Sequence, residues 1–234
     1  GIICSNTNKT YLQLKNINMN SWKYENLFYL TSDKRRILKL IDHYEVYKKI
    51  VNIKGDIIEC GVFKGASLIR MLTFRDLIEQ KSKRKVIGFD AFGKFPQPNK
   101  NYKNDKEDRS FAKKHDKDIG LGINISVLKK YLKKKKIKNY QLVKGDVLKT
   151  LTKFKLKHKK LKIALLHIDL DVYGPTKFVL NALYENISKN GIILLDDYSH
   201  IKGATSAVDE FLKNKKLKIY KVSKNGRPYF IQKK

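Results

Sequence analysis

The sequence predicts an α/β domain with a mostly parallel sheet of seven strands that ends in an antiparallel pair. From residue 56 onward, short apolar runs alternate with segments of helical periodicity, which is typical of a parallel sheet covered on both faces. Asn225-Gly226 separates the last two runs and indicates a hairpin, because both residues tolerate positive φ. A chain of 234 residues that is 41% hydrophobic can bury such a core.

The elements are expected in a simple alternating order. Residues 1–30 show little periodicity and are expected to form an irregular arm. A helix then begins with Ser32 or Asp33 as its N-cap and ends at Lys54-Gly55. Strands are expected at 56–60, 85–90, 140–144, 162–168, 191–195, 217–222 and 227–232. The helices between them are expected at 66–80, 124–136, 175–187 and 203–213.

We therefore divide the chain into an N-terminal arm and helix, residues 1–50, and a main domain, residues 51–234. The stretch 96–122 is polar and long for a connection, which is typical of a lid, a binding loop or disorder. Aromatic residues of the arm are expected to pack on the domain, close over a site or join a partner subunit in a homo-oligomer: Tyr11, Trp22, Tyr24, Phe28 and Tyr29.

The charge is extreme, with 52 Lys+Arg against 22 Asp+Glu and a net charge of +30. Such an excess can indicate a polyanionic partner such as nucleic acid, acidic glycan or a membrane surface. Only seven of the basic residues are arginines, however, and surfaces that read phosphates and bases favour arginine. The Lys-, Asn- and Ile-rich composition favours codon bias, so a nucleic-acid partner is not our first interpretation.

Other features point to a reducing cytoplasm. No apolar run reaches the roughly 18 residues of a membrane-spanning helix. The first ten residues lack the pattern of a secretory signal. The two cysteines, Cys4 and Cys60, form neither a disulfide framework nor a metal-ligand spacing. Cys60 lies inside an apolar run and is expected to be a buried packing residue.

The first expected strand leads into a glycine-rich turn, Glu59-Cys60-Gly61-Val62-Phe63-Lys64-Gly65. Glycines at such a turn allow the backbone to approach a ligand closely. The spacing E-x-G-x-x-x-G differs from the G-x-G-x-x-G of dinucleotide enzymes. It suits a ligand without a diphosphate, such as S-adenosylmethionine, although an ordinary strand–turn–helix corner would look similar.

Two further acids follow successive strands. Asp90 ends the second strand, where an acid can accept the hydroxyls of a ribose. Asp146 follows the third strand, where an acid could meet an adenine amino group. Each acid alone could be a helix cap or a turn residue. Together with Glu59 they stand at three successive strand ends, which favours a nucleoside site.

Four more carboxylates end the next two strands: Asp169 and Asp171 follow one, and Asp196 and Asp197 follow the other. The carboxyl ends of parallel strands meet at one edge, so these acids should repel one another unless a cation lies among them. Oxygen ligands suit Mg²⁺ or Ca²⁺ rather than zinc. If the strand stays extended, Asp169 and Asp171 point oppositely, and one of them is free for another role.

Three segments, GDIIECGVFKGAS, FDAFGKFPQP and HIDLDVYGPTKFVLNALYENISKNGIILLDDY, resemble the macrocin O-methyltransferase (TylF-type) family. The resemblance runs from about Gly55 to Phe211. It implies a Rossmann-like class I methyltransferase fold and enzymes that methylate sugar hydroxyls with S-adenosylmethionine and Mg²⁺. The sequence departs from the family pattern at Ala66, Ala91 and Phe95, near the expected cofactor and substrate entrance.

Carried over by position, the resemblance implies roles for particular residues. Asp169, Asp196 and Asp197 would hold Mg²⁺, and Asp171 would be the general base. S-adenosylmethionine would lie among Glu59, Gly61, Val62, Gly65, Ser67, Asp90, Asp146 and Asp169. His200, in the loop after the metal acids, is the rival base. His167 lies within an apolar strand and is expected to be a core histidine.

We therefore expect an S-adenosylmethionine- and Mg²⁺-dependent O-methyltransferase that acts on a hydroxyl of a sugar or of a glycosylated small molecule. The metal would orient two vicinal hydroxyls and lower the pKa of one, and Asp171 would accept the proton. Two other functions stay open. An RNA methyltransferase could use the positive charge, although no aromatic-flanked tetrad for a flipped base is apparent. A non-catalytic S-adenosylmethionine-binding protein could also keep the fold.

Overall fold

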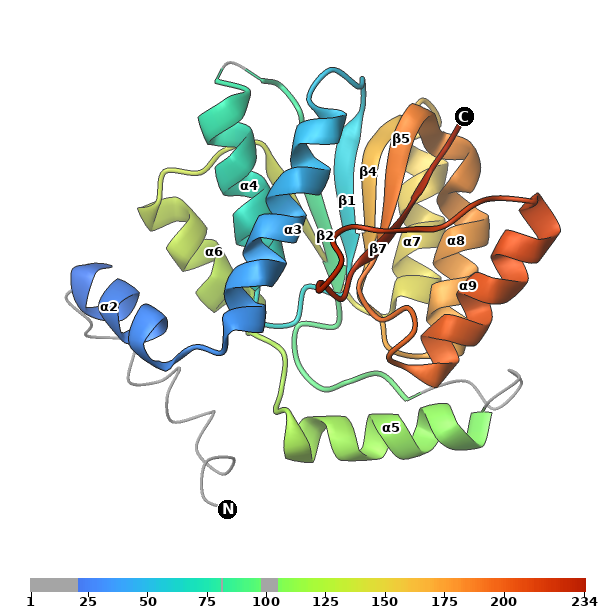
Figure 1. The fold of residues 1–234 in the computed structure, drawn as a ribbon, viewed down its shortest axis with the longest axis horizontal. Helices are drawn as coiled ribbons and strands as arrows, with labels where there is room; N and C mark the ends of the chain where they lie inside the picture. The colour runs from blue at the N-terminus through green and yellow to red at the C-terminus, as the bar shows by residue number, and fades with distance from the viewer. Residues whose placement is uncertain (1–20, 81, 98–104) are drawn as a thin grey trace.

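A seven-stranded sheet forms the centre of the molecule, with strand order β3-β2-β1-β4-β5-β7-β6 (Figure 1). The computed structural model describes residues 21–80, 82–97 and 105–234. Strands β1 to β5 run parallel, and β7 is antiparallel to both β5 and β6, as predicted. The strands are β1 (Asp56–Cys60), β2 (Val86–Asp90), β3 (Tyr140–Lys144), β4 (Ile163–Ile168), β5 (Ile187–Leu195), β6 (Tyr220–Lys221) and β7 (Tyr229–Gln232).

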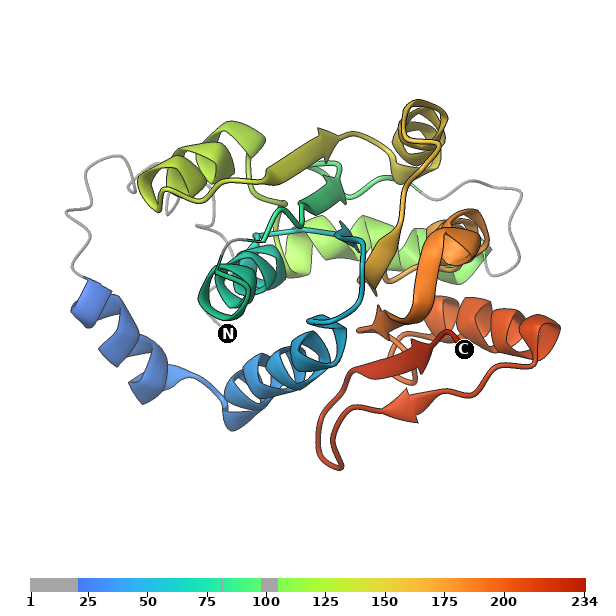
Figure 2. The same cartoon turned by 90° about the horizontal axis from the view of Figure 1, so that it is seen from above.

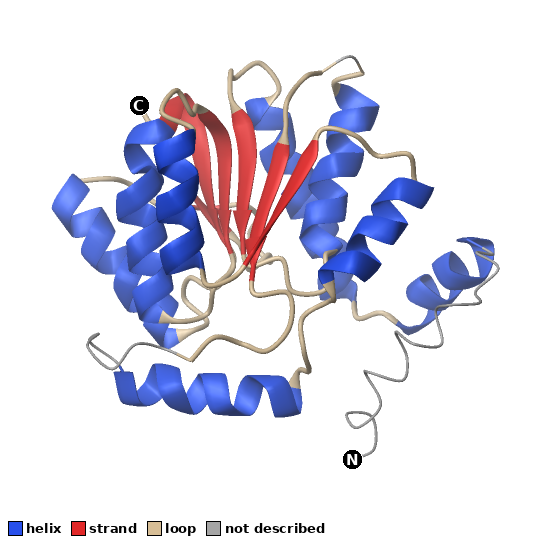
Figure 3. Ribbon diagram, turned by 180° about the vertical axis from the view of Figure 1, so that it is seen from behind, coloured by secondary structure: helices blue, strands red, loops and turns tan. Residues whose placement is uncertain are grey.

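Helices cover both faces of this sheet (Figures 2 and 3). One face packs against α3 (Lys34–Ile50), α4 (Ala66–Ile78) and α6 (Ile125–Lys134). The other packs against α7 (Val147–Lys157), α8 (Tyr173–Leu183) and α9 (Lys202–Lys215). Neighbouring strand residues therefore enter different cores, as with Ile57 and Ile58. No helix in the described ranges is long and apolar enough to cross a membrane.

Helix α3 joins the arm to the sheet. Its N-cap is Asp33, whose side chain accepts a hydrogen bond from the Arg35 N–H, in agreement with the predicted start. Val46, Tyr47 and Ile50 are fully buried against the sheet and α4, so the helix shares a core with the residues that follow it. The predicted division at residue 50 stays a prediction. Residues 1–20 of the arm, including Cys4 and Tyr11, lie outside the described residues.

Two helices fall where irregular structure was expected. Helix α2 (Ser21–Thr31) lies apart from the sheet, and none of its residues is buried (Figure 1). Helix α5 (Asp105–Asp118) occupies much of the stretch 96–122 and crosses the carboxyl ends of the strands (Figure 3). Neither helix carries the regular apolar stripe that identifies a helix packed on a core, which explains why the sequence pattern missed them.

Two further expectations were wrong in detail. Helix α7 was not predicted, although Val147, Leu151 and Phe154 bury one face at helical spacing. The lysines and threonines between them hid that pattern. Helix α8 ends at Leu183, followed by a short 3₁₀ turn, η2 (Tyr184–Asn186), so β5 begins at Ile187 rather than residue 191.

The C-terminal hairpin is present but its turn is wider than predicted. Tyr220 pairs with Phe230, and neither Asn225 nor Gly226 has the positive φ of a two-residue turn. Glycine suits position 226 for another reason, because a Cβ there would overlap the carboxylate of Asp42 on α3 unless that side chain moved. This close approach brings the turn to the rim of the cavity at the end of the sheet.

Candidate active site

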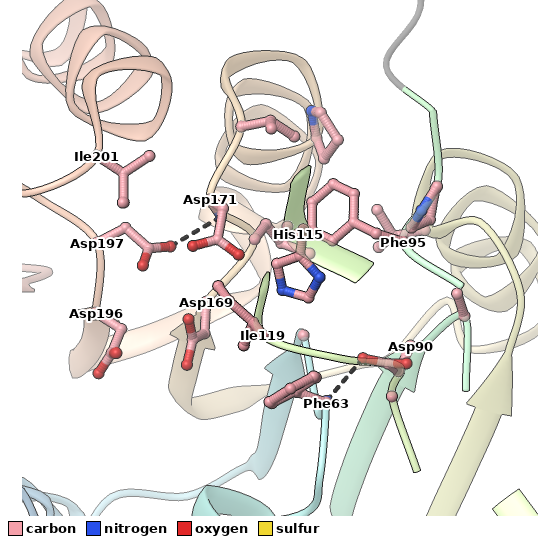
Figure 4. A pocket seen from close by; sticks show the side chains of 18 of the residues that line it. Phe63, Asp90, Phe95, His115, Ile119, Asp169, Asp171, Asp196, Asp197 and Ile201 are labelled. Carbon is pink, nitrogen blue, oxygen red and sulfur yellow. Dashed lines mark hydrogen bonds between the residues drawn. The ribbon is translucent and has the colours of Figure 1, made fainter. Parts of the chain in front are cut away.

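A cavity of about 810 Å³ opens at the carboxyl ends of β1, β2, β4 and β5 (Figure 4). The strand order reverses beside β1, and open α/β sheets bind their ligands at such a switch point. Most of the predicted site residues line it: Gly61, Asp90, Asp146, Asp169, Asp171, Asp196, Asp197 and His200. Four others are not part of the lining: Glu59, Val62, Gly65 and Ser67.

The glycine-rich turn is built around backbone torsions that glycine tolerates. Gly61 has φ +93°, and a Cβ on it would overlap the carbonyl oxygen of Asp169. Gly65 has φ +85° and caps α4 without a side-chain hydrogen bond. The turn therefore lies directly against the end of β4, which joins the glycine motif to the first of the clustered acids.

Asp90 holds this turn from the end of β2. Its Oδ2 accepts hydrogen bonds from the N–H groups of Val62 and Phe63 at 2.8 and 2.9 Å (Figure 4). Its Oδ1 accepts one from the N–H of Phe92 at 2.5 Å. Asp90 therefore holds the turn and also lines the cavity.

Asp146 is a helix cap, one of the interpretations that its position allowed, and its predicted contact with an adenine stays a prediction. It caps α7 by accepting a hydrogen bond from the Leu148 N–H at 2.9 Å, and it lines the cavity.

Glu59 and Ser67 are buried and do not line the cavity. The Ser67 hydroxyl donates to Oε1 of Glu59 at 2.6 Å, and Glu59 is fully buried.

Aromatic rings form part of the cavity wall, and the sequence pattern did not point to His115 among them. Phe63, Phe95 and His115 line the cavity, with the rings of Phe95 and His115 4.6 Å apart and those of Phe63 and His115 5.5 Å apart (Figure 4). His115 lies on α5, within the stretch 96–122 that was expected to be a lid, a binding loop or disorder. No sequence motif therefore identified it as a site residue. Burial lowers the pKa of His115, which favours its neutral ring.

The acids that follow β4 do not alternate as they would on an extended strand. Strand β4 ends at Ile168, and Asp171 has φ +61°, in the left-handed region. The turn brings carboxylate oxygens of Asp169, Asp171 and Asp197 within 4.8 Å of one another. The Asp171 N–H donates to Oδ2 of Asp197 at 2.9 Å (Figure 4).

Burial, and after it the repulsion of nearby acids, raises the pKa values of all three carboxyl groups. Burial, followed by repulsion from Asp169 and Asp196, raises the pKa of Asp171 to about 7. Burial and the neighbouring acids also raise the pKa values of Asp169 and Asp197 well above the usual range. Carboxylates packed this closely need protons or a cation among them, and an all-oxygen donor set fits a hard ion such as Mg²⁺.

Asp196 lines the same cavity but faces different partners. Its Oδ2 accepts a hydrogen bond from Nζ of Lys39 at 2.5 Å, and that ammonium also lies 4.0 Å from Oδ2 of Asp169. Lys39 comes from α3, and nothing in the sequence pattern singled it out. The group of three acids that the structure gathers therefore contains Asp171, whereas the group that the resemblance implies contains Asp196.

Behind Asp196 lie two buried histidines. The Nε2 atoms of His43 and His167 are 3.8 and 3.9 Å from Oδ1 of Asp196, and Nδ1 of His167 is 3.7 Å from Oε2 of Glu59. His167 is buried, as expected of a core histidine, whereas His43 was not anticipated. Burial lowers the pKa of His43 to about 4. Burial also opposes the charge on His167, but Asp196 and Glu59 raise its pKa to about 10.

The remaining predicted base, His200, lies on the exposed loop after β5 and lines the cavity. Its Nδ1 is 3.0 Å from the carbonyl oxygen of Tyr198. Six basic residues also line the cavity: Arg35, Arg36, Lys39, Lys94, Lys149 and Arg227.

The strand order, the glycine-rich turn after β1 and the acid that ends β2 define a methyltransferase with a Rossmann-like α/β fold. The chain belongs to the macrocin-O-methyltransferase (TylF) family, whose family model matches residues 26–226. No curated protein matches the sequence.

Solved structures share this fold at low sequence identity. The O-methyltransferase NovP has a TM-score of 0.70 at 20% identity, over 83% of this chain and 79% of that one. The calicheamicin methyltransferase CalS11 has a TM-score of 0.69 at 20% identity, over 99% of this chain and 94% of that one. An apo structure of CalS11, described as a TDP-rhamnose 3′-O-methyltransferase, gives 0.67 at 21% identity, over 99% and 96%.

Proposed function

We propose that the protein transfers the methyl group of S-adenosylmethionine to a hydroxyl of a sugar or of a glycosylated small molecule. The observation that carries the proposal is a single cavity with the glycine turn and Asp90 on one side and four clustered acids on the other. Its volume of about 810 Å³ lies within the range of small-molecule sites. Membership of the macrocin-O-methyltransferase family supports both the donor and the class of acceptor.

The donor fits the side of the cavity nearest β1, β2 and β3. Asp90 faces the space where ribose hydroxyls would hydrogen-bond, and Asp146 the space for an adenine amino group. Gly61 allows the backbone to approach the amino-acid portion closely. The rings of Phe63 and His115 offer an apolar surface to the nucleoside.

We propose that Mg²⁺ binds the carboxylates that follow β4 and β5, with Asp169, Asp196 and Asp197 as ligands. When bound, the ion supplies Lewis-acid chemistry, orienting vicinal hydroxyls and lowering the pKa of the one that reacts. Asp169 and Asp197 also belong to the group that the structure gathers. Asp196 can bind the ion through Oδ2 once the hydrogen bond from the Lys39 ammonium to that oxygen is broken.

Asp171 is the proposed general base. It takes the proton of the sugar hydroxyl as the new oxygen–carbon bond forms and the sulfur–carbon bond breaks, which leaves S-adenosylhomocysteine and a methyl ether. The cavity places both reactants side by side, and such positioning supplies much of the rate enhancement of a bimolecular transfer.

One observation favours a second assignment. Because Asp171 lies with Asp169 and Asp197 within 4.8 Å, it can serve as the third metal ligand in place of Asp196. The base would then be His200, which lines the same cavity. The two assignments differ in which variant loses Mg²⁺, Asp196→Asn or Asp171→Asn.

The basic residues in the cavity lining support an anionic acceptor, such as a sugar that carries phosphate groups. CalS11, which shares the fold, is described as acting on a TDP sugar. The test incubates the protein with S-adenosylmethionine and a panel of free sugars, sugar phosphates and nucleotide sugars, with and without a chelator. Methyl addition to a phosphorylated sugar that stops with chelator is expected. Transfer to none of them, together with transfer to RNA, would overturn the proposal.

A further inference from the structure

A second cluster of metal-binding atoms lies behind the acids of the cavity. His43 comes from α3, His167 from β4, and Asp196 from the loop after β5. The Nε2 atoms of the two histidines approach the same oxygen, Oδ1 of Asp196, at 3.8 and 3.9 Å. One ligand atom from each of the three residues lies within 4.8 Å of the others.

The polar atoms of this cluster lack partners within the described part of the chain. Both histidine side chains are fully buried, yet none of their four ring nitrogens makes a hydrogen bond, and neither does Oδ1 of Asp196. Buried polar groups in proteins are nearly always hydrogen-bonded, because an unsatisfied group carries its full desolvation cost. Three of these atoms, the two Nε2 nitrogens and Oδ1 of Asp196, lie around one point and indicate a missing ligand.

The separations match a metal ion better than a hydrogen bond. A nitrogen–oxygen distance of 3.8 or 3.9 Å is too long for a hydrogen bond. Two ligands about 2.1 Å from a tetrahedral ion are about 3.4 Å apart, so a small inward shift of the side chains would complete the coordination.

A supporting shell is already in place. Oε2 of Glu59 is 3.7 Å from Nδ1 of His167, the nitrogen that faces away from Asp196. The other oxygen of Glu59 accepts the hydroxyl of Ser67 at 2.6 Å. Histidines that bind metals usually give their second nitrogen to a carboxylate, which fixes the ring and raises its basicity.

The charges around the cluster also allow a cation. Glu59 is fully buried and the Asp196 side chain is 12% exposed, and the positive charge that these carboxylates favour between them can be a proton on His167 or a metal ion. Two cations reduce the attraction of these carboxylates for a metal ion without removing it. Lys39 is 2.5 Å from the other oxygen of Asp196, and Arg70 interacts electrostatically with Asp196 and Glu59. Asp196 lines the cavity and so provides the route of entry.

We propose that His43, His167 and Asp196 form a second metal site, which binds Zn²⁺ or a similar divalent transition ion. Two imidazoles and one carboxylate suit such ions, whereas Mg²⁺ prefers oxygen ligands. Asp196 offers Oδ1 to this site and Oδ2 to the side of Lys39 and Asp169, so the two sites use different oxygens. The ion would tie α3 to the ends of β4 and β5 beneath the acids of the cavity.

The test is a titration of tag-free protein with Co²⁺, in saturating Mg²⁺ so that oxygen-only sites are filled. We expect about one equivalent of Co²⁺ to bind with the visible absorption of a nitrogen-coordinated ion. His43→Gln should lose that absorption, and Glu59→Gln should weaken binding roughly 10–100-fold. His158→Gln, which removes an exposed histidine stacked on Phe154, is the matched control and should bind as wild type does. An absent signal in wild type, or a full signal in His43→Gln, would overturn the proposal.

A second measurement needs no variant that might misfold. In ¹⁵N-histidine-labelled wild type, Zn²⁺ should shift the ring resonances of two of the five histidines, and no others. Shifts confined to exposed histidines would contradict the site. The result is independent of methyl transfer and of Mg²⁺ binding, so the proposed function can fail while this site stands.

Discussion

A single backbone torsion sets the chemistry of Asp171. With φ at +61°, the residue leaves the line of β4 and turns its carboxylate toward Asp169 and Asp197. An extended residue at this position would point to the opposite face of the sheet. The same turn puts Asp171 in the wall of the cavity, where we propose that it meets the acceptor hydroxyl.

Asp171→Asn should therefore lower the turnover of methyl transfer by about 10²–10⁴-fold, the usual contribution of a general base. The affinity for S-adenosylmethionine should stay unchanged, because the donor side of the cavity is untouched. Steady-state kinetics with the sugar acceptor and calorimetry with the donor measure the two effects. His200→Gln is the matched comparison, and a larger loss there than in Asp171→Asn would move the role of base to His200.

Lys39 bonds the carboxylate of Asp196, which we propose as a ligand of Mg²⁺. Its ammonium bonds Oδ2 of Asp196 and lies 4.0 Å from Asp169. Lys39→Met should tighten Mg²⁺ binding by roughly tenfold or more, since an opposing charge about 4 Å away is removed. Lys48→Met on the exposed side of the same helix, where Lys48 pairs with Glu45, should leave the affinity as it is. Equal Mg²⁺ affinity in both variants, measured by calorimetry, would show that Lys39 does not compete.

Which residues could be found from the sequence depends on how they are positioned. Asp90, Asp146 and Asp169 follow strands, and a parallel sheet brings strand ends together whatever else happens. Lys39, His43 and His115 are on helices, and only the packing of those helices decides what they face. No local pattern in a single sequence encodes that packing.

At the scale of elements, the turn between β1 and α4 packs closely against the backbone that follows β4. Gly61 has φ +93° and touches the backbone of Asp169, so the glycine turn and the acid cluster cannot move independently.

Gly61→Ala should lower the melting temperature by roughly 5 °C or more and weaken S-adenosylmethionine binding. Gly93→Ala is the control for stability, because nothing lies within 4 Å of its would-be Cβ. Equal melting temperatures for the two variants would contradict this account of the turn.

The sequence predicted strands better than helices for a physical reason. Strands buried on both faces are short apolar runs, and β1 has the predicted bounds. The edge strand β3 has them too, although its residues are only partly buried or exposed. Helix α7 buries only three residues among polar ones, and α5 spans the open end of the sheet. A helix with so narrow an apolar stripe resembles a loop in its sequence.

At the scale of the whole molecule, the net charge of +30 can be tested for function. If the lysines are only solvated, methyl transfer to a sugar acceptor should change little between 50 and 200 mM salt, because a small anion makes few ionic contacts. A nucleic-acid substrate held through 6–10 phosphate contacts would lose about 10³–10⁵ in affinity over the same range. The rate of methyl transfer is measured at acceptor concentrations below KM. A steep fall of this rate with salt would favour a polyanionic substrate.

The central claim is that one cavity binds both S-adenosylmethionine and Mg²⁺, and calorimetric titration of the donor and then of Mg²⁺ tests it most directly. Wild type and Asp196→Asn should both bind the donor, because Asp90 and the glycine turn are intact in each. Wild type should bind Mg²⁺ and Asp196→Asn should bind it weakly or not at all. Donor binding without Mg²⁺ binding in wild type would contradict the metal-dependent mechanism, and the absence of donor binding would contradict the proposed function itself.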